Sequence, residues 1–231
     1  MENFKLSSRL FSEIFWSSIL NNADTLKPYL KELTLELNKL EELRQIADYN
    51  TGSISLSDAW CLFSVINYFK PKIVVEIGTF IGKSTWSIAK SLEIQKSNNS
   101  EIFTCDISND IKIPWKGSVK IHQFPKQSSI EMLKNIDKDI DFLSIDGRIS
   151  KEDKVEIERL VNQNVIIALD DFEGSEKGVA NLFSLKSIDK LKNHFLVYPC
   201  MHQTLKNFGF TSHSLTAILI SANLIQLTPQ G

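Results

Sequence analysis

Short apolar runs alternate with stretches of helical periodicity from about residue 50 onward, and this alternation limits the fold more than any other feature of the chain. The expected strands are 72–77, 101–106, 118–123, 140–145, 164–169, 194–199 and 214–220. The expected helices are 56–69, 83–94, 128–136, 151–162 and 175–188. Such alternation predicts parallel strands joined by right-handed crossovers, with helices on both faces of one sheet. The first five runs are almost continuously apolar, which is typical of strands covered on both faces.

Residues 1–48 have a different sequence pattern, with no glycine and a stripe of leucines. The leucine spacing of 4, 3, 4 and 3 residues predicts one face of a helix, formed by Leu26, Leu30, Leu33, Leu37 and Leu40. A shorter amphipathic helix is expected before it, at Leu10, Phe11, Ile14 and Phe15. We expect these helices to pack on the core, or to serve as a lid or a homodimer contact. The predicted organisation is a helical extension at 1–48 and a second domain at 49–231.

Composition excludes several classes of protein. A chain of 231 residues can bury a sizeable core without disulfides or a structural metal. Its 26 basic and 28 acidic residues give no general attraction to nucleic acid or to an anionic membrane. Cys61, Cys105 and Cys200 include no C-x-x-C pair, which argues against a disulfide framework and a zinc cluster and favours a reducing cytoplasm. Arg9 and Glu13 interrupt the first apolar stretch, and no apolar run suits a membrane span, so we expect neither a signal peptide nor a membrane helix.

Ligands of an open parallel sheet bind beyond the carboxyl ends of its strands, so the residues after each strand are candidates for chemistry. The first strand leads into EIGTFIGKS, where Gly78 allows a sharp turn and Gly82 allows a helix to begin close to a ligand. The N–H groups of that helix, with Ser84 in its first turn, would face the site. The glycines are not spaced as in G-x-G-x-x-G, which disfavours a pyrophosphate ligand. Glu76 and Asp106 end consecutive strands, and Asp106 either accepts hydrogen bonds from a ribose diol or caps a helix.

Three carboxylates follow the fourth and fifth expected strands: Asp146, Asp170 and Asp171. Neighbouring strands bring them to one rim of the sheet, where unpaired carboxylates would resist ionising together. A divalent cation such as Mg²⁺, which prefers oxygen ligands, would resolve that conflict. The alternatives are that Arg148 or a lysine neutralises them, or that Asp170 caps the next helix.

The four histidines form no pair with metal-ligand spacing. His122 and His194 lie in expected strands, where a structural role is favoured. His202 follows the sixth expected strand and His213 precedes the seventh, near a loop that could border the site. Either of these two is therefore a candidate general base.

The stretch EIGTFIGKS at 76–84 resembles the E-[IL]-G-x-x-x-G-x-S loop of class I S-adenosylmethionine-dependent methyltransferases, in particular of the catechol-type and small bacterial O-methyltransferases. The resemblance covers about residues 49–221. It implies a Rossmann-like α/β fold with a seven-stranded, mostly parallel sheet in the order 3-2-1-4-5-7-6, the last strand being antiparallel. The helical extension at 1–48 would be an addition to this fold.

The resemblance also implies a set of cofactor-binding residues. In the family, this loop cradles the methionine part of S-adenosylmethionine, and the aspartate at the position of Asp106 binds the ribose hydroxyls. Ser129 matches a serine that lies by the adenine, although Gln127 replaces the usual glycine before it. NTGS at 50–53 resembles a loop that closes over the cofactor. The implied cofactor-binding residues are Thr51, Gly52, Glu76, Gly78, Thr79, Gly82, Ser84, Asp106, Ser129 and Asp146.

The resemblance implies a metal site but departs from the family at the catalytic base. In the catechol-type branch the metal positions fall on Asp146, Asp170 and Asp171, the last being commonly asparagine. The lysine of the catechol enzymes and the histidine of many bacterial relatives both fall on Ile149, so the base is missing or supplied elsewhere. Without a metal, Asp146 or His202 is our candidate for accepting the proton.

We therefore expect a cytoplasmic enzyme that transfers a methyl group from S-adenosylmethionine to the hydroxyl of a small molecule, with Mg²⁺ as a candidate second cofactor. A cation would lower the pKa of the acceptor hydroxyl and orient it. We expect no nucleic-acid or membrane partner, and the leucine stripe allows a homodimer. The alternatives are a metal-independent N- or sugar O-methyltransferase, and a methyltransferase-fold binding protein without catalysis, which Ile149 would favour. The glycine spacing disfavours a third alternative, a nicotinamide dehydrogenase.

Overall fold

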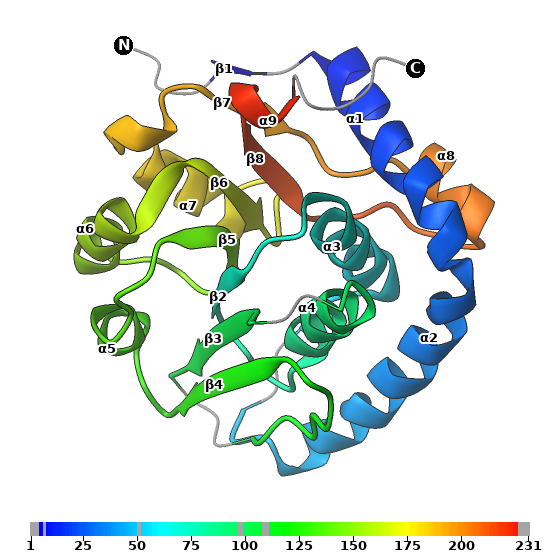
Figure 1. Ribbon diagram of the computed structural model, residues 1–231, viewed down its shortest axis with the longest axis horizontal. Coiled ribbons are helices and arrows are strands. Elements are labelled where there is room, and N and C mark those ends of the chain that lie inside the picture. The colour runs from blue at the N-terminus through cyan, green and yellow to red at the C-terminus, as the bar shows by residue number, and fades with distance from the viewer. Residues whose placement is uncertain (1–4, 7, 50–51, 97–98, 108–110, 226–231) are drawn as a thin grey trace.

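A twisted sheet forms the centre of the computed structural model, which describes residues 5–6, 8–49, 52–96, 99–107 and 111–225. Within these residues the sheet has eight strands in the order β1-β7-β8-β6-β5-β2-β3-β4 (Figure 1). The strands are β1 (Lys5–Leu6), β2 (Ile73–Ile77), β3 (Glu101–Asp106), β4 (Lys120–Pro125), β5 (Ile140–Ile145), β6 (Val161–Leu169), β7 (His194–Val197) and β8 (Ala217–Ser221). Only β8 runs antiparallel to its neighbours, β6 and β7, among the described strands.

The predicted strand order is confirmed. Numbered without β1, the sheet has the order 3-2-1-4-5-7-6 with an antiparallel last strand. The strands expected at 101–106 and 140–145 have the observed bounds, whereas β4 begins two residues later than expected. The sequence prediction missed β1, which pairs with β7 at the sheet edge and is too short to show a periodic pattern.

The helices are α1 (Arg9–Asn22), η1 (Ala23–Leu26), α2 (Lys27–Glu41), η2 (Glu42–Ile46), α3 (Leu56–Phe69), α4 (Lys83–Ile94), α5 (Ser129–Lys134), α6 (Lys151–Leu160), α7 (Lys177–Leu185), η3 (Asp189–Leu191), α8 (His202–Leu205), η4 (Lys206–Phe208) and α9 (Ala222–Ile225). The predicted helices 56–69 and 83–94 agree with α3 and α4. Serine hydroxyls cap several helices, as Ser55 does for α3 and Ser150 does for α6. In the described part of the chain, no helix combines the length and apolar character needed to cross a membrane.

Helices cover both faces of the sheet (Figure 1). One face carries α1 to α4, whose apolar side chains join those of β2, β5, β6 and β8 in one large core cluster. The opposite face carries α5, α6 and α7 over a second cluster. Each strand of the sheet centre is therefore apolar on both faces, as the near-continuous apolar runs predict.

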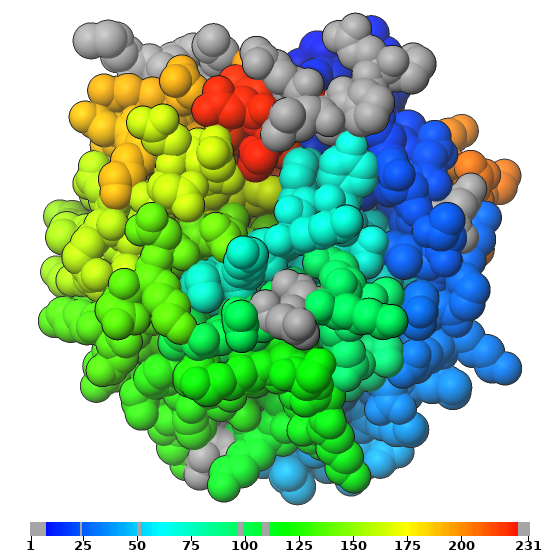
Figure 2. Space-filling model, viewed as in Figure 1, coloured from blue at the N-terminus to red at the C-terminus, as the bar shows by residue number. Residues whose placement is uncertain are grey.

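The helices of the N-terminal segment belong to the first of these clusters. Trp16 of α1 is 1% exposed, and its Nε1 donates a hydrogen bond of 2.8 Å to the carbonyl of Tyr198. In α2, Leu33, Leu37 and Leu40 of the leucine stripe are buried. The two helices form a continuous band along one flank of the molecule (Figure 2). The leucine stripe thus faces α3 and α4 within the chain.

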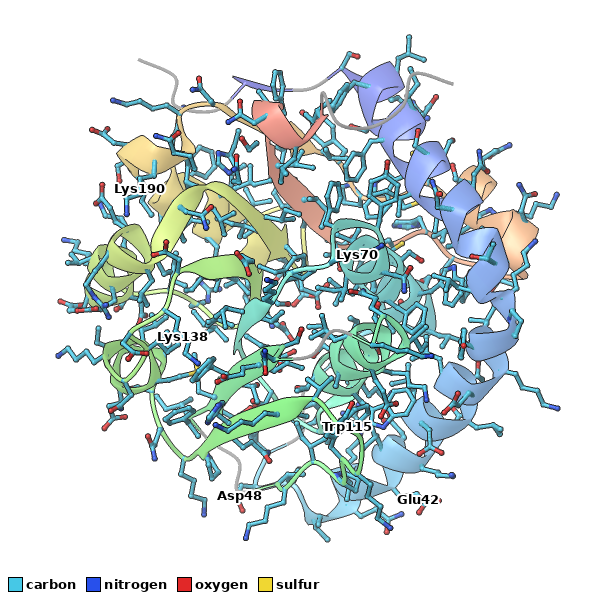
Figure 3. The ribbon with its side chains drawn as sticks, viewed as in Figure 1. Glu42, Asp48, Lys70, Trp115, Lys138 and Lys190 are labelled. Carbon is cyan, nitrogen blue, oxygen red and sulfur yellow. The ribbon has the colours of Figure 1, made fainter. Side chains whose placement is uncertain are left out.

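The segment after η2 leads from this flank to the carboxyl edge of the sheet. Asp48, labelled in Figure 3, pairs with Lys126 just beyond β4 at 3.2 Å. Leu43 and Ala47 pack against Phe80 and Ile81 of the loop after β2. The chain therefore passes over the carboxyl ends of β3 and β4 before α3 begins.

We expect Asp58→Ala to lower the free energy of unfolding by about 3 kcal/mol, because the change leaves buried donors without an acceptor. Asp58 is 3% exposed. Its Oδ1 accepts hydrogen bonds from Ser214 Oγ at 2.5 Å and from the Leu215 N–H at 2.6 Å. Urea denaturation would measure the loss. The matched control is Asp189→Ala, because the Asp189 side chain is 73% exposed and its change should be nearly neutral. Equal stability of the two variants would contradict the prediction.

Candidate functional site

Two cavities lie at the carboxyl ends of β2, β3, β5 and β6. The first has a volume of about 250 Å³ and is lined by Tyr49, Ile77, Gly78, Phe80, Cys105, Asp106, Ile107, Ser129, Asp146, Gly147, Arg148 and Lys177. The second has a volume of about 130 Å³ and is lined by Gly52, Ser53, Ile54, Ser55, Asp58, Asp146, Asp170, Asp171, Lys177 and Leu215. Asp146 and Lys177 line both cavities, so they mark the boundary between them.

The loop after β2 turns tightly at the mouth of the first cavity. Gly78, Phe80 and Gly82 have φ angles of +101°, +44° and +80°, all in the left-handed region. A Cβ on Gly78 would lie 3.0 Å from the backbone nitrogen of Gly147, so this position requires glycine. A Cβ on Gly82 would instead meet the side chain of Ile113 at 2.6 Å. Gly82 is required by its left-handed cap before α4 and its contact with Ile113, and the close approach to a ligand stays a prediction.

Glu76 is a buried acid with an incomplete set of hydrogen bonds. It is 1% exposed, and its Oε2 accepts hydrogen bonds from the hydroxyls of Thr104, at 2.5 Å, and Thr85. Thr79 joins this network through the Thr104 hydroxyl at 2.5 Å, so its side chain faces Glu76. Oε1 has no hydrogen-bond partner among the described residues. Burial raises the pKa of Glu76 to about 7, although the hydroxyls of Ser84, Thr104 and Thr85 oppose this effect.

Asp106 ends β3 with its carboxylate held at the first cavity. Its Oδ2 accepts a hydrogen bond of 2.8 Å from the Phe80 N–H and one of 3.3 Å from the Tyr49 hydroxyl. Burial, together with the negative charge of Asp106, raises the pKa of Tyr49 to about 12. The tyrosine therefore stays protonated and remains a donor at neutral pH.

The other predicted site residues are distributed over the two cavities and their surroundings. Ser129 lines the first cavity as the first residue of α5, and Gly52 lines the second cavity. Ser84 lies in the first turn of α4, as expected. Thr51 lies outside the described residues. His202 lines neither cavity, because α8 packs against α1 and its Nε2 is 3.1 Å from the Phe210 carbonyl.

A lysine lies between the carboxylates that follow β5 and β6. Lys177 Nζ is 2.6 Å from Asp146 Oδ1 and 3.0 Å from Asp171 Oδ2. Burial would lower the pKa of Lys177, but the two carboxylates outweigh it and raise the pKa above its usual value. Burial raises the pKa of Asp146, and the ammonium of Lys177 opposes this effect. The pair is therefore a charged, partly buried ion pair that faces both cavities.

Asp170 has a different partner. Its Oδ1 accepts a hydrogen bond of 2.8 Å from the hydroxyl of Thr216. Burial raises the pKa of Asp170 to about 8, and the nearby charges of Asp146 and Asp58 add to the effect. The surroundings of Asp170 therefore favour its protonated form.

This arrangement does not fit the divalent cation that the sequence led us to expect at Asp146, Asp170 and Asp171. The ammonium of Lys177 lies between two of the three carboxylates, and the third accepts a hydrogen bond from Thr216. No group of three or more His, Cys, Asp and Glu side chains among the described residues is placed to hold a metal ion. Asp146 and Asp171 therefore pair with a lysine, which is one of the alternatives left open by the sequence.

Sequence reasoning did not identify Lys177 and Tyr49 as site residues. Lys177 begins a helix seven residues after Asp170, and Asn181 follows one turn later on the same face. This Lys-x-x-x-Asn spacing after a strand-end Asp-Asp pair was the available signal. Tyr49 directly precedes the loop at 50–53, and its hydroxyl could have been paired with a strand-end acid.

Comparisons with known proteins agree with this geometry. Residues 75–172 match a family model described as a methyltransferase domain. The O-methyltransferase TomG from Streptomyces achromogenes, solved with SAM, is 12% identical with a TM-score of 0.56, covering 80% of this chain and 89% of that chain. An O-methyltransferase from Bacillus cereus in complex with SAH is 13% identical with a TM-score of 0.54, covering 80% and 90%. A search of curated proteins gave no match. The predicted resemblance to class I methyltransferases and the predicted fold are confirmed.

Proposed function

We propose that this chain, whose residues 75–172 match a methyltransferase-domain model, transfers the methyl group of S-adenosylmethionine to a hydroxyl of a small molecule. The first cavity would hold the cofactor and the second the acceptor. The observation that carries the proposal is a pair of acids near the ends of adjacent strands: Asp106, which lines the first cavity, and Glu76, which is buried next to the cavity residue Ile77 in the chain. The similar folds of O-methyltransferases solved with SAM and SAH support it.

The residues around the first cavity fit this cofactor. The Glu76 carboxylate has a buried acceptor atom, Oε1, without a donor among the described residues, and the methionine ammonium would supply one. Asp106 is held by Phe80 and Tyr49 in one orientation, which suits a ribose diol. Gly78 presents backbone without a side chain beside both groups.

The chemistry requires alignment and a proton acceptor. When bound, S-adenosylmethionine supplies an electrophilic methyl group on sulfur; the S–C bond breaks with its electron pair going to sulfur, and a C–O bond forms. Asp146 lies between the two cavities, so its carboxylate can accept the proton of the acceptor hydroxyl. Lys177 fixes the orientation of that carboxylate through its 2.6 Å contact. The mechanism that we propose uses no divalent cation and no contribution from His202.

The charge of the second cavity favours one alternative acceptor. Its lining includes four aspartates and one lysine, namely Asp58, Asp146, Asp170, Asp171 and Lys177. This excess of carboxylates would attract an amine, so N-methylation is the second candidate function. NMR of the methylated product would distinguish the two reactions, because both add the same mass but a methyl group on oxygen and one on nitrogen differ in chemical shift.

We also propose that the segment before the methyltransferase domain covers the cofactor loop. The guanidinium of Arg44 lies 5.0 Å from the ring centroid of Phe80, and the Tyr49 ring lies 5.4 Å from it. Glu41 pairs with Lys83 at the start of α4. These contacts support the proposal that this segment is held in place over the cofactor loop. The homodimer and the cytoplasmic location remain predictions from the sequence.

Calorimetric titration of the cofactor-free chain with S-adenosylmethionine tests the proposed function. We expect binding by the wild-type protein and about hundredfold weaker binding by Asp106→Ala, because two charge-assisted hydrogen bonds to the ribose are lost. The exposed Asp189→Ala variant is the matched control and should bind as the wild type does. Absence of binding by folded wild-type protein would refute the proposed function.

A further inference from the structure

The ammonium of Lys177 has the position of a bridging cation. It is within 3.0 Å of an oxygen of Asp146 and of Asp171, which follow two neighbouring strands, β5 and β6. The ion pair is only partly exposed, with 27% of the Lys177 side chain and 25% of the Asp146 side chain accessible to solvent. Solvent therefore screens this pair less than a surface salt bridge.

The backbone of α7 is fixed where it presents this lysine. Gly178, the next residue, packs directly on the backbone of Asp170 and Phe172, and its N–H donates to the Asp171 carbonyl at 3.3 Å. The helix therefore begins in contact with the end of β6. The backbone of Lys177 is thereby held beside the carboxylates that follow β5 and β6.

A second anchor lies one turn along α7. Asn181 is 2% exposed, and its Nδ2 donates to the Gly147 carbonyl at 2.8 Å. Its Oδ1 accepts a hydrogen bond of 3.2 Å from the Ile149 N–H. Asn181 thus ties α7 to the loop that carries Asp146. Lys177 and Asp146 are positioned by the same two elements, so their contact is pre-organised.

We propose that Lys177 takes the place of a divalent cation in this site, and that the fixed Lys177–Asp146 pair, in place of a metal, positions the methyl acceptor at the boundary of the two cavities. Lys177 is a positioning residue in this view, with its third N–H donor directed by the pair toward an acceptor oxygen. The part of this inference that concerns the methyl acceptor rests on the proposed function. The part that concerns the exclusion of a divalent cation does not. It predicts that the lysine and a divalent cation compete for the same carboxylates.

Binding of Mn²⁺, measured by electron paramagnetic resonance on the chelator-treated full chain, tests this competition without an acceptor. We expect wild-type protein to bind Mn²⁺ at least about tenfold more weakly than Lys177→Met, in which a side chain of similar length carries no charge. Lys177→Arg keeps the charge and should behave as the wild type. Lys151→Met is the matched control, because Lys151 is an exposed first-turn lysine of α6 that lines neither cavity.

Near-ultraviolet circular dichroism and S-adenosylmethionine titration accompany the measurement, so that misfolding and loss of the cofactor site are recognised. Mn²⁺ binding by the wild type as tight as that of Lys177→Met would overturn the inference. So would a folded Lys177→Met variant that gains no Mn²⁺ affinity. A wild-type chain that binds no S-adenosylmethionine would contradict the proposed function, whereas a gain of Mn²⁺ affinity by its Lys177→Met variant would still uphold the competition.

Discussion

Gly178→Ala is expected to destabilise the protein by about 3 kcal/mol, because the added methyl group has no room against the sheet. A Cβ at this position would lie under 3.0 Å from the Asp170 carbonyl oxygen and 3.1 Å from the backbone nitrogen of Phe172. Both neighbours are backbone atoms of the segment that directly follows β6. No side-chain rotation can therefore relieve the clash. The first turn of α7 must move, and Lys177 must move with it.

Thermal unfolding of Gly178→Ala should show a Tm lower by roughly 6–12 °C, as a loss of about 3 kcal/mol implies for a chain of this size. The matched control is Gly174→Ala. Gly174 has a φ of +55°, but no atom lies within 4 Å of the place that a Cβ would take, so its substitution adds backbone strain without a clash. We expect about 1 kcal/mol for the control. Equal losses in the two variants would show that α7 does not pack on β6 as described.

The strand-loop-helix unit around the cofactor loop could be predicted from the sequence because its signals are local. An apolar run ends at Glu76, two glycines punctuate the turn, and apolar residues at helical spacing follow. The structure has β2, the left-handed glycines and α4 at these positions. Gly82 has the left-handed conformation that favours glycine, and its close approach to a ligand stays a prediction.

The ion pair at the cavity boundary could not be predicted because its members are distant in the sequence. Asp146 and Lys177 are 31 residues apart and meet only because α7 folds back on the loop after β5. Three strand-end carboxylates without an assigned partner suggested a cation. A cation does pair with two of them, Asp146 and Asp171. The sequence could not show that this cation is a side chain.

The position of His202 away from the site also could not be predicted from the residues close to it in the sequence. It follows β7, and a strand-end position suggested proximity to the site. However, β7 lies toward the far edge of the sheet, and the chain after it passes to α1. Strand order, which the resemblance supplied, would have shown that β7 is separated from β5 by β8 and β6.

A large pH effect is expected from Glu76, whose pKa burial raises to about 7 from an ordinary value of 4.5. An acid with a raised pKa binds its proton more tightly in the folded chain than in the unfolded chain. Its contribution to stability is therefore complete below about pH 4.5 and is lost as the pH rises through about 7. The difference corresponds to about 3 kcal/mol.

Urea denaturation of wild type and Glu76→Gln across this range measures the effect as the difference between the two proteins. We expect the wild type to lose stability relative to Glu76→Gln as the pH rises from about 4.5 to about 7. Glu42→Gln is the control, because Glu42 is exposed at the end of α2 (Figure 3) and should show no such trend. A constant difference between wild type and Glu76→Gln would disprove the raised pKa.

Cofactor binding should reverse this titration. A bound methionine ammonium would stabilise the ionised form of Glu76 and so lower its pKa. Binding of S-adenosylmethionine near pH 7 should therefore release protons, which calorimetry in buffers of different ionisation enthalpy can count. Glu76→Gln should release none through this group and should bind more weakly, because the ammonium loses its charged partner. Proton release of equal size in both proteins would place the cofactor ammonium away from Glu76.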